Sequence, residues 1–125
     1  MQSENSKFKI KLKDRSYSYS VRIIEFLDAL PKDTSTEVIK NQLLRSATSI
    51  GANIIEAQAS SSKKDFTNFF THSLKSANES SYWLGLLRDA KKISDPKLIG
   101  LLQETKELSN ILGSSILTLK NKHKF

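Results

Sequence analysis

Apolar side chains recur every three or four residues through most of the chain, and this spacing constrains the fold more than any other feature of the sequence. The pattern divides into four segments, residues 14–30, 35–59, 63–92 and 95–121. A period near 3.6 puts the apolar residues of a segment on one face of an α-helix. Short connections make successive helices antiparallel neighbours. The sequence therefore predicts an all-α fold, an antiparallel up-down-up-down four-helix bundle.

We expect these periodic residues to form the core. The expected core residues are Tyr17, Val21, Ile23, Ile24, Phe26, Leu27 and Leu30 in the first segment, Ile39, Leu43, Ala47, Ile50, Ile54 and Ala57 in the second, Phe66, Phe70, Ala77, Leu84 and Leu87 in the third, and Leu98, Leu101, Leu102, Leu108, Leu112, Ile116 and Leu119 in the fourth. The second and third segments also carry many serines, together with Gly51. Such small side chains allow two helix backbones to approach closely, either within one bundle or between subunits.

Capping residues mark where three of the helices should begin. Thr34-Ser35-Thr36-Glu37 has the spacing of a capping box with Thr34 as the N-cap. Ser62-Lys63-Lys64-Asp65 is a looser version of the same motif, and Asp95-Pro96 places a capping carboxylate before a proline at the first helical position. Pro31 should end the first helix, because proline disfavours the helical conformation of the residue before it.

The net charge of +7 is concentrated at the two ends of the chain. Residues 1–15 contain five basic and two acidic side chains, and residues 120–125 contain three basic ones, so that +6 of the total is terminal. We divide the chain into a basic N-terminal arm (1–13), the four-helix bundle (14–121) and a basic C-terminal tail (122–125). Lys7-Phe8-Lys9-Ile10-Lys11-Leu12-Lys13 alternates with period two, which is the pattern of a strand. Because a single strand has no partner in a helical chain, we expect an extended arm that docks its apolar side on the bundle or on a neighbouring subunit; the alternative is a disordered tail.

Few kinds of catalytic or metal site are compatible with this composition. The chain has no cysteine and only two histidines, His72 and His123, and neither histidine has the Glu-x-x-His spacing of a carboxylate-bridged metal site. Phosphate-cradling glycine loops are absent as well. We therefore expect a protein that is not an enzyme and needs no cofactor. No segment has the roughly 20 apolar residues of a transmembrane helix, and no signal peptide is visible, so we expect a cytoplasmic location.

One polar stripe stands out in the second helix. Arg45, Ser49, Asn53 and Glu56 are spaced so that they share one helix face, and the third helix offers Glu79 as a possible partner for Arg45. The stripe is either a structural network that fixes helix register or subunit contacts, or a groove for a ligand or nucleic acid.

An up-down-up-down bundle brings both termini and the connection between helices two and three to the same end. That end would collect the basic residues of all three regions, which suits it to binding phosphates. The predicted nucleic-acid-binding residues are Lys7, Lys9, Lys11, Lys13, Arg15, Lys63, Lys64, Lys120, Lys122 and Lys124. We expect electrostatic binding of RNA or DNA without sequence reading, since phosphate contacts position a protein without specifying bases. The alternative is a scaffold that docks a protein partner through its helices.

The segment from Leu43 to Ala57 (Leu-Leu-Arg-Ser-Ala-Thr-Ser-Ile-Gly-Ala-Asn-Ile-Ile-Glu-Ala) resembles the four-helix-bundle family encoded in intervening sequences of bacterial 23S ribosomal RNA genes. The similarity extends over residues 15–119. It is carried further by Leu30-Pro31, Lys64-Asp65-Phe66, Ala77-Asn78-Glu79 and Tyr82-Trp83-Leu84.

The resemblance implies a barrel-shaped homopentamer with a binding role toward nucleic acid. In the branch of the family that serves diversity-generating retroelements, it implies a reverse transcriptase as partner. Arg45, Ser49, Asn53 and Glu56 match the family's helix-two motif and Glu79 its helix-three acid, whereas the basic arm and tail lie outside the motif.

Overall fold

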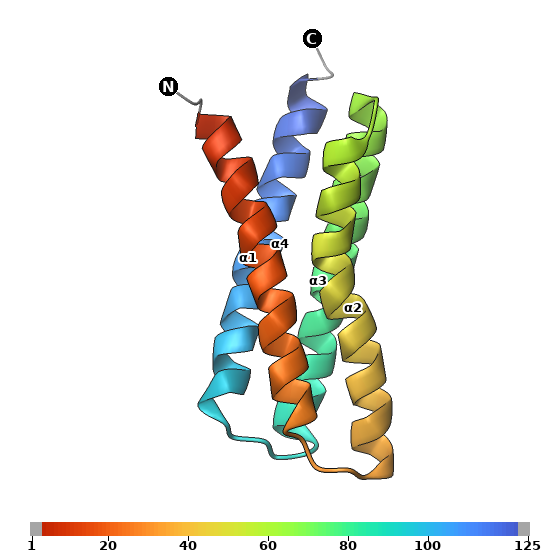
Figure 1. Cartoon of the computed structure of the whole chain (residues 1–125), viewed down its shortest axis with the longest axis vertical. Coiled ribbons are helices and arrows are strands. Elements are labelled where there is room, and N and C mark those ends of the chain that lie inside the picture. The colour runs from red at the N-terminus through yellow and green to blue at the C-terminus, as the bar shows by residue number, and fades with distance from the viewer. Residues whose placement is uncertain (1–3, 123–125) are drawn as a thin grey trace.

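The computed structural model is a bundle of four α-helices and describes the backbone of residues 4–122 and the side chains of residues 12–121. The helices are α1 (Glu4–Asp28), α2 (Thr34–Ala59), α3 (Lys63–Asp89) and α4 (Pro96–Lys122). Figure 1 shows the α1–α2 and α3–α4 connections at one end of the bundle and the α2–α3 connection at the other. Each helix therefore runs opposite to the one before it, and the predicted all-α four-helix bundle is confirmed.

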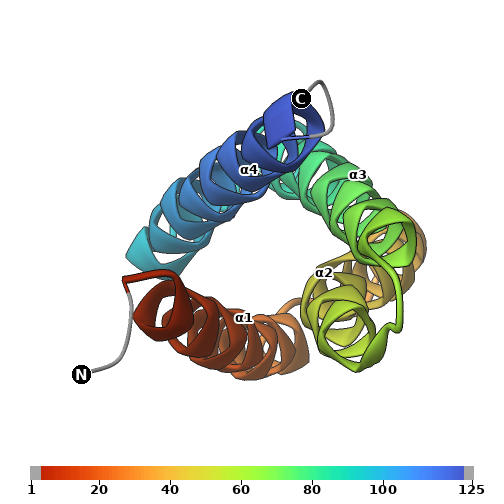
Figure 2. The same cartoon turned by 90° about the horizontal axis from the view of Figure 1, so that it is seen from above.

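Seen from above, the helices form a ring in chain order, so that α1 packs on both α2 and α4 (Figure 2). Helix α3 likewise packs on α2 and α4. None of the helices within residues 4–122 is long and apolar enough to cross a membrane.

Two of the predicted helix starts are confirmed by capping contacts in the structure. The Ser62 hydroxyl accepts a hydrogen bond from the Asp65 N–H at 3.1 Å, as its motif predicts. Asp95 likewise accepts from the Lys97 N–H at 2.9 Å, with Pro96 as the first residue of α4.

At α2 the prediction is wrong by one residue. The N-cap is Asp33, whose carboxylate accepts from the Thr36 N–H at 3.0 Å, so Thr34 is already inside the helix. Glu37 then does not complete a capping box but forms an ion pair with Lys40 at 3.2 Å.

The expectation of an extended N-terminal arm is wrong for residues 4–13, which form the first turns of α1. A lone strand beside a helical bundle would leave its backbone N–H and C=O groups without partners, whereas a continued helix pairs them within the segment. Leu12 is only 2 % exposed and packs in the core. The boundary between arm and bundle therefore does not coincide with a change of conformation at residue 13.

The core follows the predicted residues in α2, α3 and α4, although Phe66, Leu102 and Leu119 are only partly buried. In α1 the prediction is confirmed for Ile23, Phe26, Leu27 and Leu30, but it is wrong for Tyr17, Val21 and Ile24, which are 74 %, 40 % and 44 % exposed. The buried face of α1 is completed by Leu12, Ser16 and Tyr19. That face has helical spacing too, but its polar members, Ser16 and Tyr19, made it less conspicuous in the sequence.

Small side chains bring α2 close to both of its neighbours. The buried hydroxyls of Ser46 and Ser80 are 2.9 Å apart, and the Ser73 hydroxyl donates to the Ile50 carbonyl at 2.8 Å, so α2 and α3 are joined within one bundle. Gly51 faces α1 instead, because a Cβ at this position would lie 3.2 Å from the Ser16 hydroxyl oxygen.

Helices α1 and α4 are joined by a hydrogen bond between two fully buried side chains. The Tyr19 hydroxyl and the Thr105 hydroxyl are 2.6 Å apart. Since the Thr105 hydroxyl donates to the Leu101 carbonyl at 2.6 Å, Tyr19 is the donor to Thr105. Burial raises the pKa of Tyr19 to about 12, because a phenolate would lose its hydration there.

The first prediction concerns this hydrogen bond. Tyr19→Phe should lower the free energy of unfolding by about 1 kcal/mol, the typical net value of one buried hydrogen bond. Urea unfolding followed by circular dichroism measures the change, and Tyr17→Phe at an exposed position is the matched control. Between pH 10 and 12 the wild type should also lose stability, because Tyr19 keeps its proton in the folded state while the unfolded chain loses it. Tyr19→Phe should lose less over the same interval, and an equal loss would contradict the assignment.

The second prediction concerns the start of α2. The hydrogen bond from the Thr36 N–H, assisted by Lys91, lowers the pKa of Asp33 to about 2. Because the folded-state pKa lies below the ordinary value, the contribution of Asp33 to stability is present above pH 4 and disappears as the pH falls toward 2. The difference in unfolding free energy between wild type and Asp33→Ala should therefore shrink over that interval. Asp33→Asn, which caps without titrating, should remove the pH dependence while keeping the helix start.

Candidate functional site

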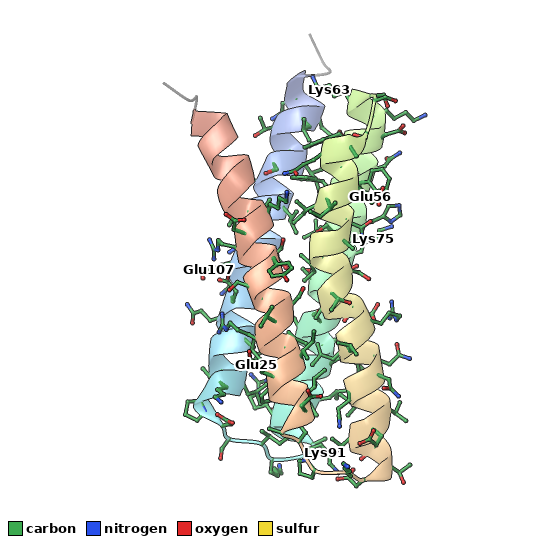
Figure 3. All side chains as sticks on the ribbon, viewed as in Figure 1. Glu25, Glu56, Lys63, Lys75, Lys91 and Glu107 are labelled. Atoms are coloured by element: carbon green, nitrogen blue, oxygen red, sulfur yellow. The ribbon has the colours of Figure 1, made fainter. Side chains whose placement is uncertain are left out.

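The start of α1, the end of α4 and the α2–α3 connection lie at the same end of the bundle (Figure 1). Lys63 and Lys64 are exposed in the first turn of α3, and Figure 3 shows Lys63 at that end. Lys120 is exposed near the end of α4. Lys13 is exposed on α1 and lies roughly 13 Å along the helix from its first residue, at 1.5 Å per residue. We call Lys63, Lys64 and Lys120 the basic end.

The other predicted basic residues are less fully defined by the structure. Residues 7, 9 and 11 lie in α1 and residue 122 ends α4, but their side chains, together with Lys124 as a whole, fall outside the described part of the chain.

Arg15 holds α1 and α4 together and does not extend the basic end. Its guanidinium donates to both carboxylate oxygens of Glu104, at 3.1 and 2.5 Å, and to Glu107 at 3.4 Å. The hydrogen bond with Glu104 is the largest cause of a raised pKa of Arg15. We therefore assign Arg15 to packing of the bundle and leave it out of the basic end.

An open pocket of about 490 Å³ lies beside the basic end, between the C-terminus of α2, the start of α3 and the end of α4. Its lining combines serine hydroxyls with an aromatic ring and one lysine: Ala57, Gln58, Ser60, Ser61, Ser62, Lys63, Phe66 and Leu119. The Phe66 ring stacks on Phe70 with the ring centroids 4.6 Å apart.

The opposite end of the bundle has charges of both signs. Lys91 pairs with Asp33 at 3.1 Å, and Arg88 pairs with its neighbour Asp89 at 2.7 Å. The exposed Lys32, Lys92 and Lys97 also lie at this end, together with the acidic Asp28 and Asp95, so that its charges are mixed.

The polar stripe of α2 is linked to α3 through Arg45. Arg45 forms an ion pair with Glu79, and the same Glu79 oxygen accepts from the Trp83 indole N–H at 2.9 Å. Gln42 accepts a further hydrogen bond from Arg45 at 3.2 Å. The predicted pairing of Arg45 with a carboxylate of the next helix is thus present, and Trp83 is part of the same cluster.

The remaining members of the stripe do not join this cluster. Ser49 and Asn53 hydrogen-bond to backbone carbonyls one turn earlier in α2, at 2.7 and 2.9 Å. Glu56 is exposed and forms no ion pair with any described side chain. These contacts favour a structural role for Arg45 and Glu79, which tie α2 to α3.

No metal site emerges from the part of the chain with defined side chains, where no three His, Asp or Glu residues are grouped closely enough to hold an ion. His72 is exposed on α3.

The third prediction compares the two cross-helix ion pairs. Arg45 and Glu79 are 58 % and 36 % exposed, so a double-mutant cycle with Arg45→Met and Glu79→Gln should give a coupling below about 1 kcal/mol. Arg15 and Glu104 are only 27 % and 15 % exposed, and the equivalent cycle with Arg15→Met and Glu104→Gln should give a larger coupling. Urea unfolding measures both cycles, and the reverse order would contradict these assignments.

The family model of the 23S rRNA-intervening sequence protein matches residues 9–114. No curated protein matches the chain.

A solved structure has the same fold: a protein of unknown function from the S23 ribosomal protein family of Bacteroides thetaiotaomicron VPI-5482. It is 37 % identical to this chain, superposes with a TM-score of 0.79, and the match covers 86 % of this chain and 96 % of that one. The family model spans all four helices. The chain therefore belongs to the 23S rRNA-intervening sequence protein family.

Proposed function

We propose that this protein is a non-enzymatic homo-oligomer, a pentamer, that binds RNA or DNA electrostatically through its basic end in the cytoplasm. The observation that carries the proposal is the placement of Lys63, Lys64 and Lys120 at the end of the bundle where the chain also begins and finishes. Residues 1–15 and 120–125 carry +6 of the net charge of +7 in the sequence, and α1 begins and α4 ends at that same end.

Charge at one end suits a polyanion for a simple physical reason. Lysines that neutralise phosphates release the counterions condensed on a nucleic acid, and this release supplies binding energy regardless of base sequence. At the opposite end Lys91 pairs with Asp33. The exposed Lys32, Lys92 and Lys97 there are accompanied by the acidic Asp28, Asp89 and Asp95, which oppose the attraction of a polyanion.

Assembly into a homo-oligomer would increase the affinity for nucleic acid. Several copies of the basic end on one assembly would bind one nucleic acid more tightly than a single copy, provided that the strand spans them. The pentamer is supported by the resemblance of the helix-two motif, and self-association in general by the exposed Tyr17, Val21 and Ile24 on α1.

The fourth prediction tests the basic end directly. A variant with Lys63→Gln, Lys64→Gln and Lys120→Gln should bind a fluorescently labelled RNA duplex more weakly than wild type, with a smaller dependence on salt. If each lysine neutralises one phosphate, the slope of log K against log salt should fall by about 2 to 3. Fluorescence anisotropy over a series of KCl concentrations measures this slope, and a labelled DNA duplex tests the second kind of ligand.

The matched control removes the same charge from the opposite end, with Lys32→Gln, Lys92→Gln and Lys97→Gln, all exposed. The control variant should keep most of the wild-type affinity. Equal losses in the two variants, or a wild-type affinity that does not fall between low and physiological salt, would contradict the proposal.

The competing hypothesis is a scaffold that docks a protein such as a reverse transcriptase without touching nucleic acid, and it predicts no salt-dependent binding in this titration. The contribution of residues 7–13 should be tested by Lys→Gln substitutions. Deletion of residues 1–13 would also remove the buried Leu12 and so disturb the core.

A further inference from the structure

The outer surface between α1 and α2 exposes five large apolar side chains: Tyr17, Val21, Ile24, Leu44 and Ile55. We call this group the apolar face. Monomeric proteins expose single apolar residues commonly, but a contiguous group on neighbouring helices marks an interaction surface.

The five residues are contiguous because of the helix register. Leu44, Gly51 and Ile55 share one side of α2 by their spacing of seven and four, and Gly51 contacts Ser16 of α1. On α1, Tyr17, Val21 and Ile24 are spaced four and three apart, while Arg15 faces α4 through Glu104. Both sets therefore border the α1–α2 seam on the outside of the bundle.

A second exposed surface lies on α3 and is centred on aromatic rings. Tyr82 is 60 % exposed and makes an edge-to-face contact with Trp83, with the ring centroids 5.0 Å apart. Trp83 is held in turn by its hydrogen bond to Glu79 and by the Arg45–Glu79 ion pair. We call Tyr82 and Trp83 the aromatic face. Aromatic side chains fixed in advance by their own neighbours lose little entropy on binding and are frequent anchors of interfaces.

The two faces lie at the same height along the bundle. Ile24 follows Ser16 by eight residues, so it lies near the level of residue 43 in the antiparallel α2, given that Ser16 is opposite Gly51. Tyr82 follows Ser80 by two residues, so it lies near the level of residue 44, given that Ser80 is opposite Ser46. Copies related by rotation about an axis parallel to the bundle touch one another at equal heights. The apolar face and the aromatic face satisfy this condition.

Charged residues near the two faces also lie at matching heights along the bundle. Asp14 precedes Val21 by two helical turns on α1, and Lys75 precedes Tyr82 by two turns on α3; both are exposed. Helices α1 and α3 run in the same direction (Figure 1). If Tyr82 of one copy packs on Val21 and Ile24 of the next, Lys75 falls beside Asp14. Glu25, labelled with Lys75 in Figure 3, adds to the acidic border of the apolar face.

We propose that the apolar face of one copy of this chain binds the aromatic face of a second copy, in a head-to-tail contact. The inference rests on the self-association in the proposed function and names the surfaces that produce it. Because two different faces meet, each copy keeps one face of each kind free for a further copy, and the contact closes into a ring when the rotation between copies allows it.

Two single variants and their mixture test the proposal by size-exclusion chromatography with light scattering. Ile24→Asp should spoil the apolar face only, and Tyr82→Asp the aromatic face only. Each variant alone should have the mass of one chain, 14.1 kDa, while wild type has a multiple of it. Mixed in equal amounts, the two variants should form a species of twice the mass of one chain, since one intact face of each kind remains. Formation of that species also demonstrates that both variants are folded.

Ile99→Asp, at an exposed apolar residue of α4, is the matched control and should keep the wild-type mass. Asp14→Lys and Lys75→Asp should each weaken the association, and the two together in one chain should restore it. The proposal is overturned if wild type is monomeric, if either face variant alone still self-associates as wild type does, or if the mixture stays monomeric. These outcomes are independent of the RNA titration, so a failure of nucleic-acid binding and a failure of this contact can be told apart.

Discussion

The close approach of α2 to α3 is the constraint on which most of the structure depends. The buried hydroxyls of Ser46 and Ser80 face one another across the seam at 2.9 Å, and each also hydrogen-bonds to a backbone carbonyl of its own helix. The same register brings Arg45 to Glu79 and Glu79 to Trp83. The connection between α2 and α3 is short, and Ser62 at its end caps α3 directly. Lys63 and Lys64, the first residues of α3, therefore lie at the end of the bundle.

Different kinds of side chain occupy different regions of the bundle. Buried polar contacts such as Tyr19 with Thr105 lie between helices. Charges of both signs are mixed at the end that holds Asp33 and Lys91, and Lys63, Lys64 and Lys120 are exposed at the other end. The apolar residues that the core does not use lie on the long sides of the bundle. The long sides of the bundle and its basic end are therefore available to different partners at the same time.

The sequence was sufficient for the fold because apolar periodicity and capping residues are local signals. The starts of α3 and α4 follow from Ser62 and Asp95 alone. It was insufficient for α1, where two apolar stripes compete and only packing against α2 and α4 decides that Ile23 is buried and Ile24 is exposed. The alternation of residues 7–13 was misleading for a related reason, since a period of two predicts a strand only where another strand can pair with it.

The candidate site, like the fold, could be predicted from the sequence only in part. Helix topology was enough to bring Lys63, Lys64 and the termini to one end. The partner of Arg15 could not be read from the sequence, because Glu104 is 89 residues away and only the ring of four helices makes them neighbours. The link of Trp83 to Arg45 through Glu79 could not be read from the sequence either, because it depends on the register between α2 and α3.

The continuity of α1 from Glu4 into the core has a mechanical consequence. A flexible basic tail would have to lose its freedom of movement whenever it met a ligand, whereas a helix anchored at Leu12 has already lost it during folding. Residues 4–11 are thus held by the part of α1 that packs in the core at Leu12. A force applied to them reaches the packing around Leu12 and Tyr19, so whatever binds the beginning of this chain also acts on the joint between α1 and α4.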